Sequence, residues 1–242
     1  IAIGLNYMDH CRESGVEPPD RPVIFTKFPT SIIGPGETIR WDPALTPKVD
    51  YEAELAVVIG KPGRAISRAD ARAHIAGYTC FNDVTNREAQ RSDRQFFRGK
   101  SIDTGGPCGP WIVTPDELPP LAHGLAITCR WNDKIMQQSN TDQLIFPIDH
   151  LISYISRNIT LLPGDIITTG TPETARYSDV HINLYPIPAD DYLYVDIRNV
   201  RDFVDLEAEI AVGRAPVRDL AQATTFVDKV IGYEVPVTID WQ

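Results

Sequence analysis

Positive charge is scarce in this sequence. Its 242 residues include 23 Lys and Arg against 33 Asp and Glu, which gives a formal net charge of -10. Nucleic-acid binding needs a basic surface, so the composition argues against a nucleic-acid partner. An anionic small molecule is not excluded, because a bound metal ion can reverse the local field. No apolar run reaches the roughly 18–20 residues that a membrane-spanning helix needs, so we expect no membrane partner.

Cysteine is also scarce, with only Cys11, Cys80, Cys108 and Cys129. They form no C-x-x-C pair, and a chain of this size needs no disulfides, so reduced thiols in a cytoplasmic compartment are expected. No signal peptide is visible. The sequence begins without Met inside an apolar run, so we expect an N-terminal piece to be missing, with a mitochondrial location as the alternative.

Strand patterns outnumber helix patterns along the chain. Apolar or alternating segments predict strands at 1–5, 51–60, 126–131, 165–169 and 192–197. Helices are predicted at 67–77, from an N-cap Ser67 to a terminating Gly77, and at 146–156. Because strands and helices do not alternate regularly, a doubly wound sheet is not expected. The sequence therefore predicts a β-rich, mixed α+β fold.

A short internal sequence repeat bears on domain organisation. The segments VDYEAELAV (49–57) and VDLEAEIAV (204–212) are identical at seven of nine positions. We interpret residues 1–212 as one catalytic domain and residues 213–242 as a C-terminal extension or the remnant of a partial second repeat that begins near 204. The alternative is that 204–212 is an edge strand of the first domain.

Three carboxylates suggest a metal site. On a strand, residues i and i+2 share a face, so Glu52 and Glu54 point the same way. Adjacent carboxylates repel each other unless a cation lies between them, although a solvated charged face is the alternative. Asp83 follows the predicted helix 67–77, and a return of the chain would bring it beside them. Such hard oxygen ligands select Mg²⁺, Mn²⁺ or Ca²⁺ over zinc.

Three further patterns could carry chemistry. His10 and Glu13 are neighbours if they lie on a helical turn, so that Glu13 could polarise His10 as a general base. A surface hydrogen bond is the alternative. Lys100 could stabilise an enolate or a carboxylate, or it could be a loop charge. The turn that contains Thr171 could offer hydroxyl and N–H groups to a carboxylate, or it could serve only as a turn.

Seven segments taken in order resemble the fumarylacetoacetate hydrolase superfamily. They cover most of residues 1–172 and are GLNYMDHCRE (4–13), VIFTKFPTSIIGPG (23–36), VDYEAELAVVIGK (49–61), GYTCFNDVTNREAQ (77–90), FFRGKSIDTGGPCGPWIVT (96–114), NDKIMQQSNT (132–141) and LLPGDIITTGTP (161–172). The resemblance implies a β-roll-like catalytic fold, usually in a homodimer. It also implies a Mg²⁺ or Mn²⁺ ion on Glu52, Glu54 and Asp83.

The resemblance also assigns roles to other residues. His10 and Glu13 match the pair that activates water in the hydrolases when a mobile loop closes, and Lys100 matches the active-site lysine. The residues implied to bind the substrate, a small anionic 2-oxo or dicarbonyl acid, are Arg87, Gln90, Gln137 and Thr171.

The chemistry implied is cleavage of a C–C bond in an acylpyruvate-type 1,3-dicarbonyl acid. Decarboxylation of an oxaloacetate-like acid and isomerisation or dehydration of a dienoate are the enzymatic alternatives. Residues 173–176 replace a glycine-rich loop of the family, and Gly105 replaces an aromatic residue. These departures motivate a further alternative, in which the chain is a degenerate member that acts as a binding or assembly subunit.

Overall fold

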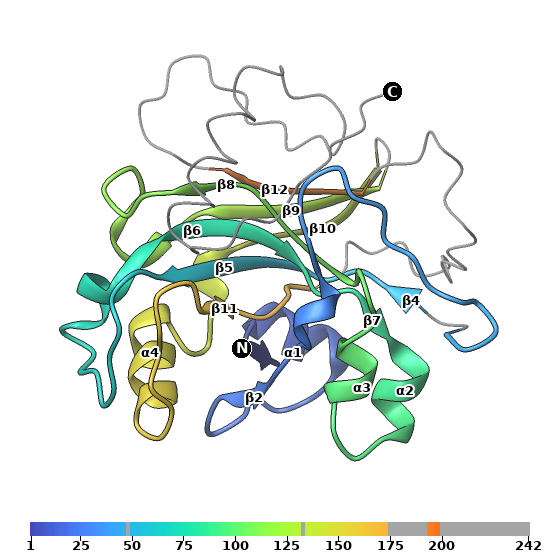
Figure 1. Ribbon diagram of the computed structural model, residues 1–242, viewed down its shortest axis with the longest axis horizontal. Coiled ribbons are helices and arrows are strands. Elements are labelled where there is room, and N and C mark those ends of the chain that lie inside the picture. The colour runs from blue at the N-terminus through green and yellow to red at the C-terminus, as the bar shows by residue number, and fades with distance from the viewer. Residues whose placement is uncertain (47–48, 132–133, 174–192, 199–242) are drawn as a thin grey trace.

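The computed structural model describes residues 1–46, 49–131, 134–173 and the strand 193–198 (Figure 1). Short helices accompany many strands, which confirms the predicted β-rich α+β class. The strands are β1 (Ala2–Gly4), β2 (Val23–Phe25), β3 (Ile32–Ile33), β4 (Val49–Asp50), β5 (Ala53–Ile59), β6 (Ile75–Asn82), β7 (Thr85–Asn86), β8 (Gly106–Val113), β9 (Ala126–Trp131), β10 (Lys134–Asn140), β11 (Ile166–Thr168) and β12 (Leu193–Arg198). The α-helices are α1 (Met8–Ser14), α2 (Arg87–Ser92), α3 (Phe97–Lys100) and α4 (Ile148–Ser156).

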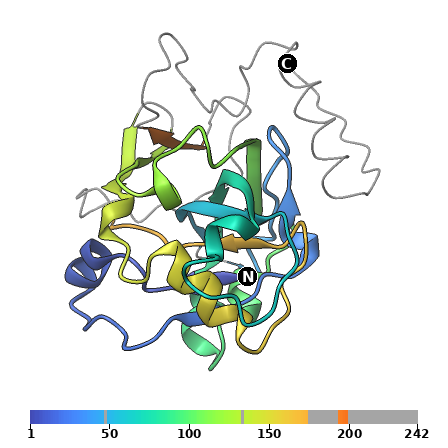
Figure 2. The ribbon, with the colours of Figure 1, turned by 90° about the vertical axis from the view of Figure 1, so that its left-hand side faces the viewer.

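Two sheets form the body of the described chain. The larger has the order β11-β5-β6-β8-β3, antiparallel except for the β3–β8 pair, and the smaller has the antiparallel order β10-β9-β12. In Figure 1 the smaller sheet lies above β5 and β6, and α4 lies below them. Figure 2 gives the same order of layers from the side. Two short pairs, β1–β2 and β4–β7, complete the strands.

The buried apolar residues form two clusters. The larger cluster joins β5, β6 and β11 to α4 and consists of Ile3, Leu55, Val57, Ile59, Ile66, Ala71, Ile75, Tyr78, Ala122, Leu125, Ile148, Leu151, Ile152, Ile155, Leu161 and Ile167. The smaller cluster joins the start of β5 to β9 and β10 and consists of Tyr7, Tyr51, Ala53, Cys80, Ile127, Cys129 and Met136. Alternate residues of β5 thus fill the core, which leaves Glu54 to face the other way.

The predicted helix at 67–77 is wrong. This stretch forms a 3₁₀ turn, Ala71–His74, and then enters β6 at Ile75. Gly77 does not end a helix. A Cβ atom at that position would lie 2.5 Å from the carbonyl oxygen of Val113 on β8, so glycine permits the close approach of two strands. Tertiary pairing has overridden the local helical pattern.

The other predicted elements that can be compared occur near their expected positions. Strands are present at Ala2–Gly4, Ala53–Ile59, Ala126–Trp131, Ile166–Thr168 and Leu193–Arg198, and helix α4 spans Ile148–Ser156. The second copy of the short repeat, at 204–212, and the extension at 213–242 lie outside the described residues. None of the helices that the structure describes is long and apolar enough to cross a membrane.

Candidate metal centre

Three buried carboxylates meet at one end of β5. One oxygen each from Glu52, Glu54 and Asp83 lies within 4.8 Å of the others. The β5–β6 register explains their proximity, because Ala53 is opposite Asn82 and the backbone N–H of Asp83 donates to the carbonyl of Glu52 at 2.9 Å. The antiparallel pair thus brings Asp83 back beside the two glutamates, as a helical return was predicted to do.

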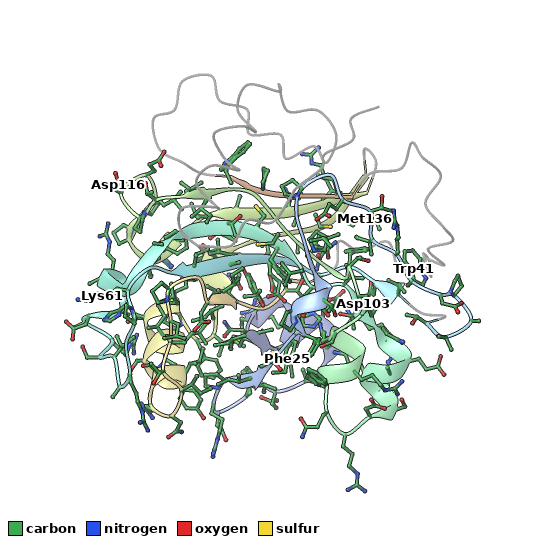
Figure 3. The ribbon with its side chains drawn as sticks, viewed as in Figure 1. Phe25, Trp41, Lys61, Asp103, Asp116 and Met136 are labelled. Carbon is green, nitrogen blue, oxygen red and sulfur yellow. The ribbon has the colours of Figure 1, made fainter. Side chains whose placement is uncertain are left out.

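Two buried lysines face this cluster. Lys100 Nζ lies 2.6 Å from Glu52 Oε2 and 2.8 Å from Asp83 Oδ2, and it also lies 5.3 Å from the centre of the Phe25 ring. Lys27 Nζ lies 2.7 Å from Asp83 Oδ1 and donates to the backbone carbonyl of Lys100. Figure 3 labels Phe25, below β5 in that view. Asp83 is therefore held between two cations.

The charges of the cluster determine its protonation. Burial acts to raise the pKa of Glu52, but the charges of Lys100 and Arg87 outweigh it and lower that pKa to about 2. Burial acts to lower the pKa of Lys100, but the charges of Asp83 and Glu52 outweigh it, so that pKa is raised. Both side chains are thus charged at neutral pH.

Glu54 has a different environment. Its Oε2 accepts a hydrogen bond from the backbone N–H of Gly170 at 2.9 Å, while its Oε1 is buried with no hydrogen-bond partner among the described residues. Burial, together with the charges of Asp83 and Glu52, raises the pKa of Glu54 to about 8. Gly170 has a φ of +94°, and a Cβ atom there would lie 2.9 Å from Cβ of Asn6, so glycine is required at this donor.

We expect the metal-free protein to lose stability as the pH rises from about 4.5 to about 8. In the unfolded chain the carboxyl of Glu54 loses its proton near its ordinary pKa of 4.5, whereas the folded state keeps the proton up to about 8. Between these values the folded state binds more protons, so the free energy of unfolding falls with rising pH.

Urea denaturation in the presence of a chelator measures this fall, with Glu54→Gln as the control. The variant lacks the titrating group and should lose this part of the pH dependence. A wild-type profile that matches the variant across this interval would contradict the expectation.

Arg87 lies beside the cluster, at the start of α2. Its Nη1 is 2.6 Å from Glu52 Oε1, its Nε is 2.8 Å from Asp50 Oδ2, and it donates from Nη1 to Gln90 Oε1 at 2.9 Å. The side chain of Asn86 caps α2 by accepting from the N–H groups of Glu88 and Ala89. The structure thus places the predicted Arg87 against Glu52, with the predicted Gln90 bonded to Arg87.

Gln137 and Thr171 lie together beside Ala53, the residue between Glu52 and Glu54. Gln137 on β10 accepts from the backbone N–H of Ala53 at 2.8 Å and donates to Thr171 Oγ1 at 2.8 Å and to the carbonyl of Pro172 at 3.1 Å. Both side chains are buried. Gln137 therefore fixes the segment around Thr171 against the start of β5.

His10 and Glu13 form the predicted local pair on α1. His10 Nδ1 is 3.4 Å from Glu13 Oε2, and their side chains are 25% and 31% exposed. The described hydrogen bonds of His10 are with Glu13 and Asp9, both on α1, so the structure does not bring its ring into contact with the three carboxylates.

Sequence reasoning missed Lys27 and Asp50. Lys27 lies in the VIFTKFPTS stretch, where a single lysine among apolar residues was a usable signal for a buried charge. Asp50 immediately precedes the Y-E-A-E segment, so its closeness to Glu52 and Glu54 could be read from the sequence. Its ion pair with Arg87, which lies 37 positions away, could not be read from the sequence.

Residues 1–199 match the family model described as fumarylacetoacetate (FAA) hydrolase C-terminal. This chain belongs to the fumarylacetoacetate hydrolase family. The resemblance inferred from seven short segments is thereby confirmed.

Relatives of known name extend the comparison. Over 174 residues the chain is 48% identical to a Bos taurus protein named oxaloacetate tautomerase FAHD2A, mitochondrial, covering 71% of this chain and 55% of that protein. The chain thus spans about half the length of the curated relatives it matches.

Among solved structures, 5-carboxymethyl-2-hydroxymuconate delta-isomerase from Mycobacterium smegmatis is 40% identical, with a TM-score of 0.69 over 82% of this chain and 74% of that one. The 2-hydroxyhepta-2,4-diene-1,7-dioate isomerase from Mycobacterium marinum is 38% identical, with a TM-score of 0.68 over 82% and 69%.

Proposed function

We propose that this protein is a Mg²⁺- or Mn²⁺-dependent tautomerase that interconverts the keto and enol forms of a small 2-oxo dicarboxylic acid such as oxaloacetate. The observation that carries the proposal is the cluster of Glu52, Glu54 and Asp83 with Lys100 between two of its carboxylates. The relatives named as a tautomerase and as isomerases support a proton shift over bond cleavage. Hydrolysis was the first expectation from the sequence, and it stays a second candidate.

The residues present fit a divalent cation. The donor set is three carboxylates, the hard oxygen ligands that Mg²⁺ and Mn²⁺ prefer. The buried Oε1 of Glu54 lacks a partner in the described structure and would gain one from an ion. Glu52, Glu54 and Asp83 would hold the ion, which would supply a Lewis acid that polarises the C2 carbonyl of the substrate.

The chain's own residues can serve the proton shift. Tautomerisation removes a proton from C3, and the electron pair of that C–H bond forms the C2–C3 double bond while the C2 oxygen gains a proton from water. We propose that His10, polarised by Glu13, is the base that takes the C3 proton. Lys100 carries a fixed positive charge in a buried site, where it favours the negative charge that develops on the oxygen at C2. One proton is removed and one is added, so the composition and the carbon skeleton are conserved.

We assign binding of the substrate's second carboxylate, the one remote from the C2 carbonyl, to residues around the cluster. Arg87 presents a guanidinium that suits a carboxylate, and Gln90 accepts from it. Gln137 donates to Thr171 Oγ1 and so orients that hydroxyl, which can itself donate to a substrate oxygen. A dicarboxylic acid can therefore place one carboxylate toward a metal ion held by the cluster and the other toward Arg87.

The second candidate is hydrolysis of a C–C bond in an acylpyruvate-type acid. The His10–Glu13 contact of 3.4 Å favours it, since a histidine beside a glutamate can act as a general base toward water. Decarboxylation uses the same binding residues but releases CO₂. These reactions differ in their products, so one experiment can separate them.

The test is turnover of oxaloacetate and, separately, of an acylpyruvate, each with added Mg²⁺ or Mn²⁺ and with a chelator. The enol form is followed by ultraviolet absorbance and the products by NMR. We expect metal-dependent keto–enol exchange with the four-carbon skeleton intact. CO₂ and pyruvate, or two acids released from an acylpyruvate, would favour the other chemistries. Metal binding without any of these reactions would contradict the proposed activity. Absence of metal binding would favour the alternative in which the chain is a degenerate family member that acts as a binding or assembly subunit.

Two wider expectations belong to the same proposal. The homodimer inferred from the family resemblance is checked by light scattering of the full chain. The relatives' names support the mitochondrial alternative for its location over the cytoplasmic one.

A further inference from the structure

Helix α1 carries His10 and Glu13, and its start is tied firmly to the fold. Asn6 is fully buried. Its Nδ2 donates to the carbonyls of Thr169 at 2.8 Å and Phe146 at 3.1 Å, and its Oδ1 accepts from the N–H of Phe146 at 2.8 Å. The next residue, Tyr7, packs in the smaller core cluster with Tyr51, directly before Glu52. The first turn of α1 therefore begins next to the metal ligands.

The rest of α1 has little apolar packing. Among its residues, Cys11 is the buried one, and Arg12, Glu13 and Ser14 are exposed. A single small buried side chain contributes little free energy toward fixing a helix of seven residues. A polar contact is therefore needed to fix the orientation of the helix.

Asp9 makes such a contact. Its Oδ2 accepts a hydrogen bond from the hydroxyl of Ser139 on β10, and its Oδ1 lies 2.7 Å from the backbone nitrogen of His10. Ser139 and Gln137 are two positions apart on a regular stretch of β10, so their side chains leave the same face of the strand. The strand that positions Gln137 against the metal ligands also receives Asp9.

We propose that Asp9 and Ser139 are positioning residues that hold α1 so that His10 and Glu13 are presented to the site. The proposal rests on the proposed function for its effect on turnover. One carboxylate sets the helix orientation through Ser139 and contacts the backbone of His10. Without this bond, Asn6 still anchors the start of the helix, but the turn with His10 and Glu13 can swing away.

The variant that tests this is Ser139→Ala, which removes one half-buried hydroxyl and leaves Asp9 in place. We expect backbone amides of α1 to exchange hydrogen on the order of tenfold faster, because a hydrogen bond to a charged group is lost. We expect kcat for oxaloacetate tautomerisation to fall by a similar factor, with KM and the Mg²⁺ affinity unchanged. Ser139→Thr keeps the hydroxyl and should restore both.

Two further variants act as controls. Ser67→Ala removes another serine–aspartate bond, that of Ser67 with Asp70 at 2.6 Å in an exposed turn, and should leave α1 exchange and kcat unchanged. Asp9→Ala combined with Ser139→Ala should show no larger effect than Asp9→Ala alone, because the two residues act as one unit.

The outcomes separate this proposal from the proposed function. Hydrogen exchange needs no substrate, so it judges the contact even if the wild type turns over nothing. Unchanged α1 exchange in Ser139→Ala would overturn the proposal. Faster exchange with unchanged kcat in an active enzyme would overturn the positioning role as well.

Discussion

Replacing Asp83 with asparagine is expected to weaken Mg²⁺ binding by roughly a hundredfold or more, beyond the usual cost of losing an outer-shell partner. Turnover should be lost with it. Asn keeps the shape of the side chain but removes one of the three carboxylate charges that converge in the cluster. It also leaves Lys27 and Lys100 facing one negative charge fewer, which disfavours a cation further.

Calorimetric titration with Mg²⁺ measures this effect, and oxalate can then serve as a mimic of the enolate. The matched control is Asp149→Asn, which neutralises an aspartate on α4 that pairs with the exposed Arg68. That variant should bind Mg²⁺ as the wild type does. Wild-type affinity in Asp83→Asn would exclude this cluster as the metal site.

Replacing Lys100 with methionine is expected to lower kcat by about 10²–10³, the usual cost of removing one buried electrostatic stabiliser. Mg²⁺ affinity should hold or increase, since the ammonium no longer occupies Glu52 Oε2 and Asp83 Oδ2. The metal-free variant should be less stable than the wild type, because its carboxylates lose a cation, and Mg²⁺ should restore that stability.

The control for Lys100→Met is Lys61→Met. Lys61 is exposed just beyond the opposite end of β5, and Figure 3 shows it well away from Phe25, whose ring lies against Lys100. Steady-state kinetics at saturating Mg²⁺ separates the effects of metal binding from those on turnover. A kcat that stays near the wild-type value would show that Lys100 acts only to balance the negative charge of the three carboxylates.

Local spacing predicted those parts of the site that depend on one element. The i and i+2 relation in the extended segment that leads into β5 placed Glu52 and Glu54 together, and the i and i+3 relation on α1 placed His10 beside Glu13. These relations follow from the geometry of strands and helices, so one sequence suffices. Their chemical roles remain predictions for the experiments above.

Contacts between distant segments were beyond local patterns. Lys27 reaches Asp83 across 56 positions, and no periodicity in either segment encodes that pairing. The helix predicted at 67–77 failed for the same reason, because the β6–β8 contact at Gly77 depends on a strand more than thirty positions further along. The family resemblance named the three carboxylates, Lys100 and Arg87, which the structure brings together, but it did not name Lys27, whose charge faces Asp83.

The Asn6 contacts have a consequence for how the protein is made. Asn6 bonds Thr169 across 163 positions, and Glu54 bonds Gly170 across 116. A ribosome must therefore deliver residue 170 before the surroundings of Glu54 are complete, although β5 and β6 can pair much earlier. Closure of these long loops is thus a late event in folding of the chain. The moment at which a divalent ion binds during refolding would therefore report when the loops have closed.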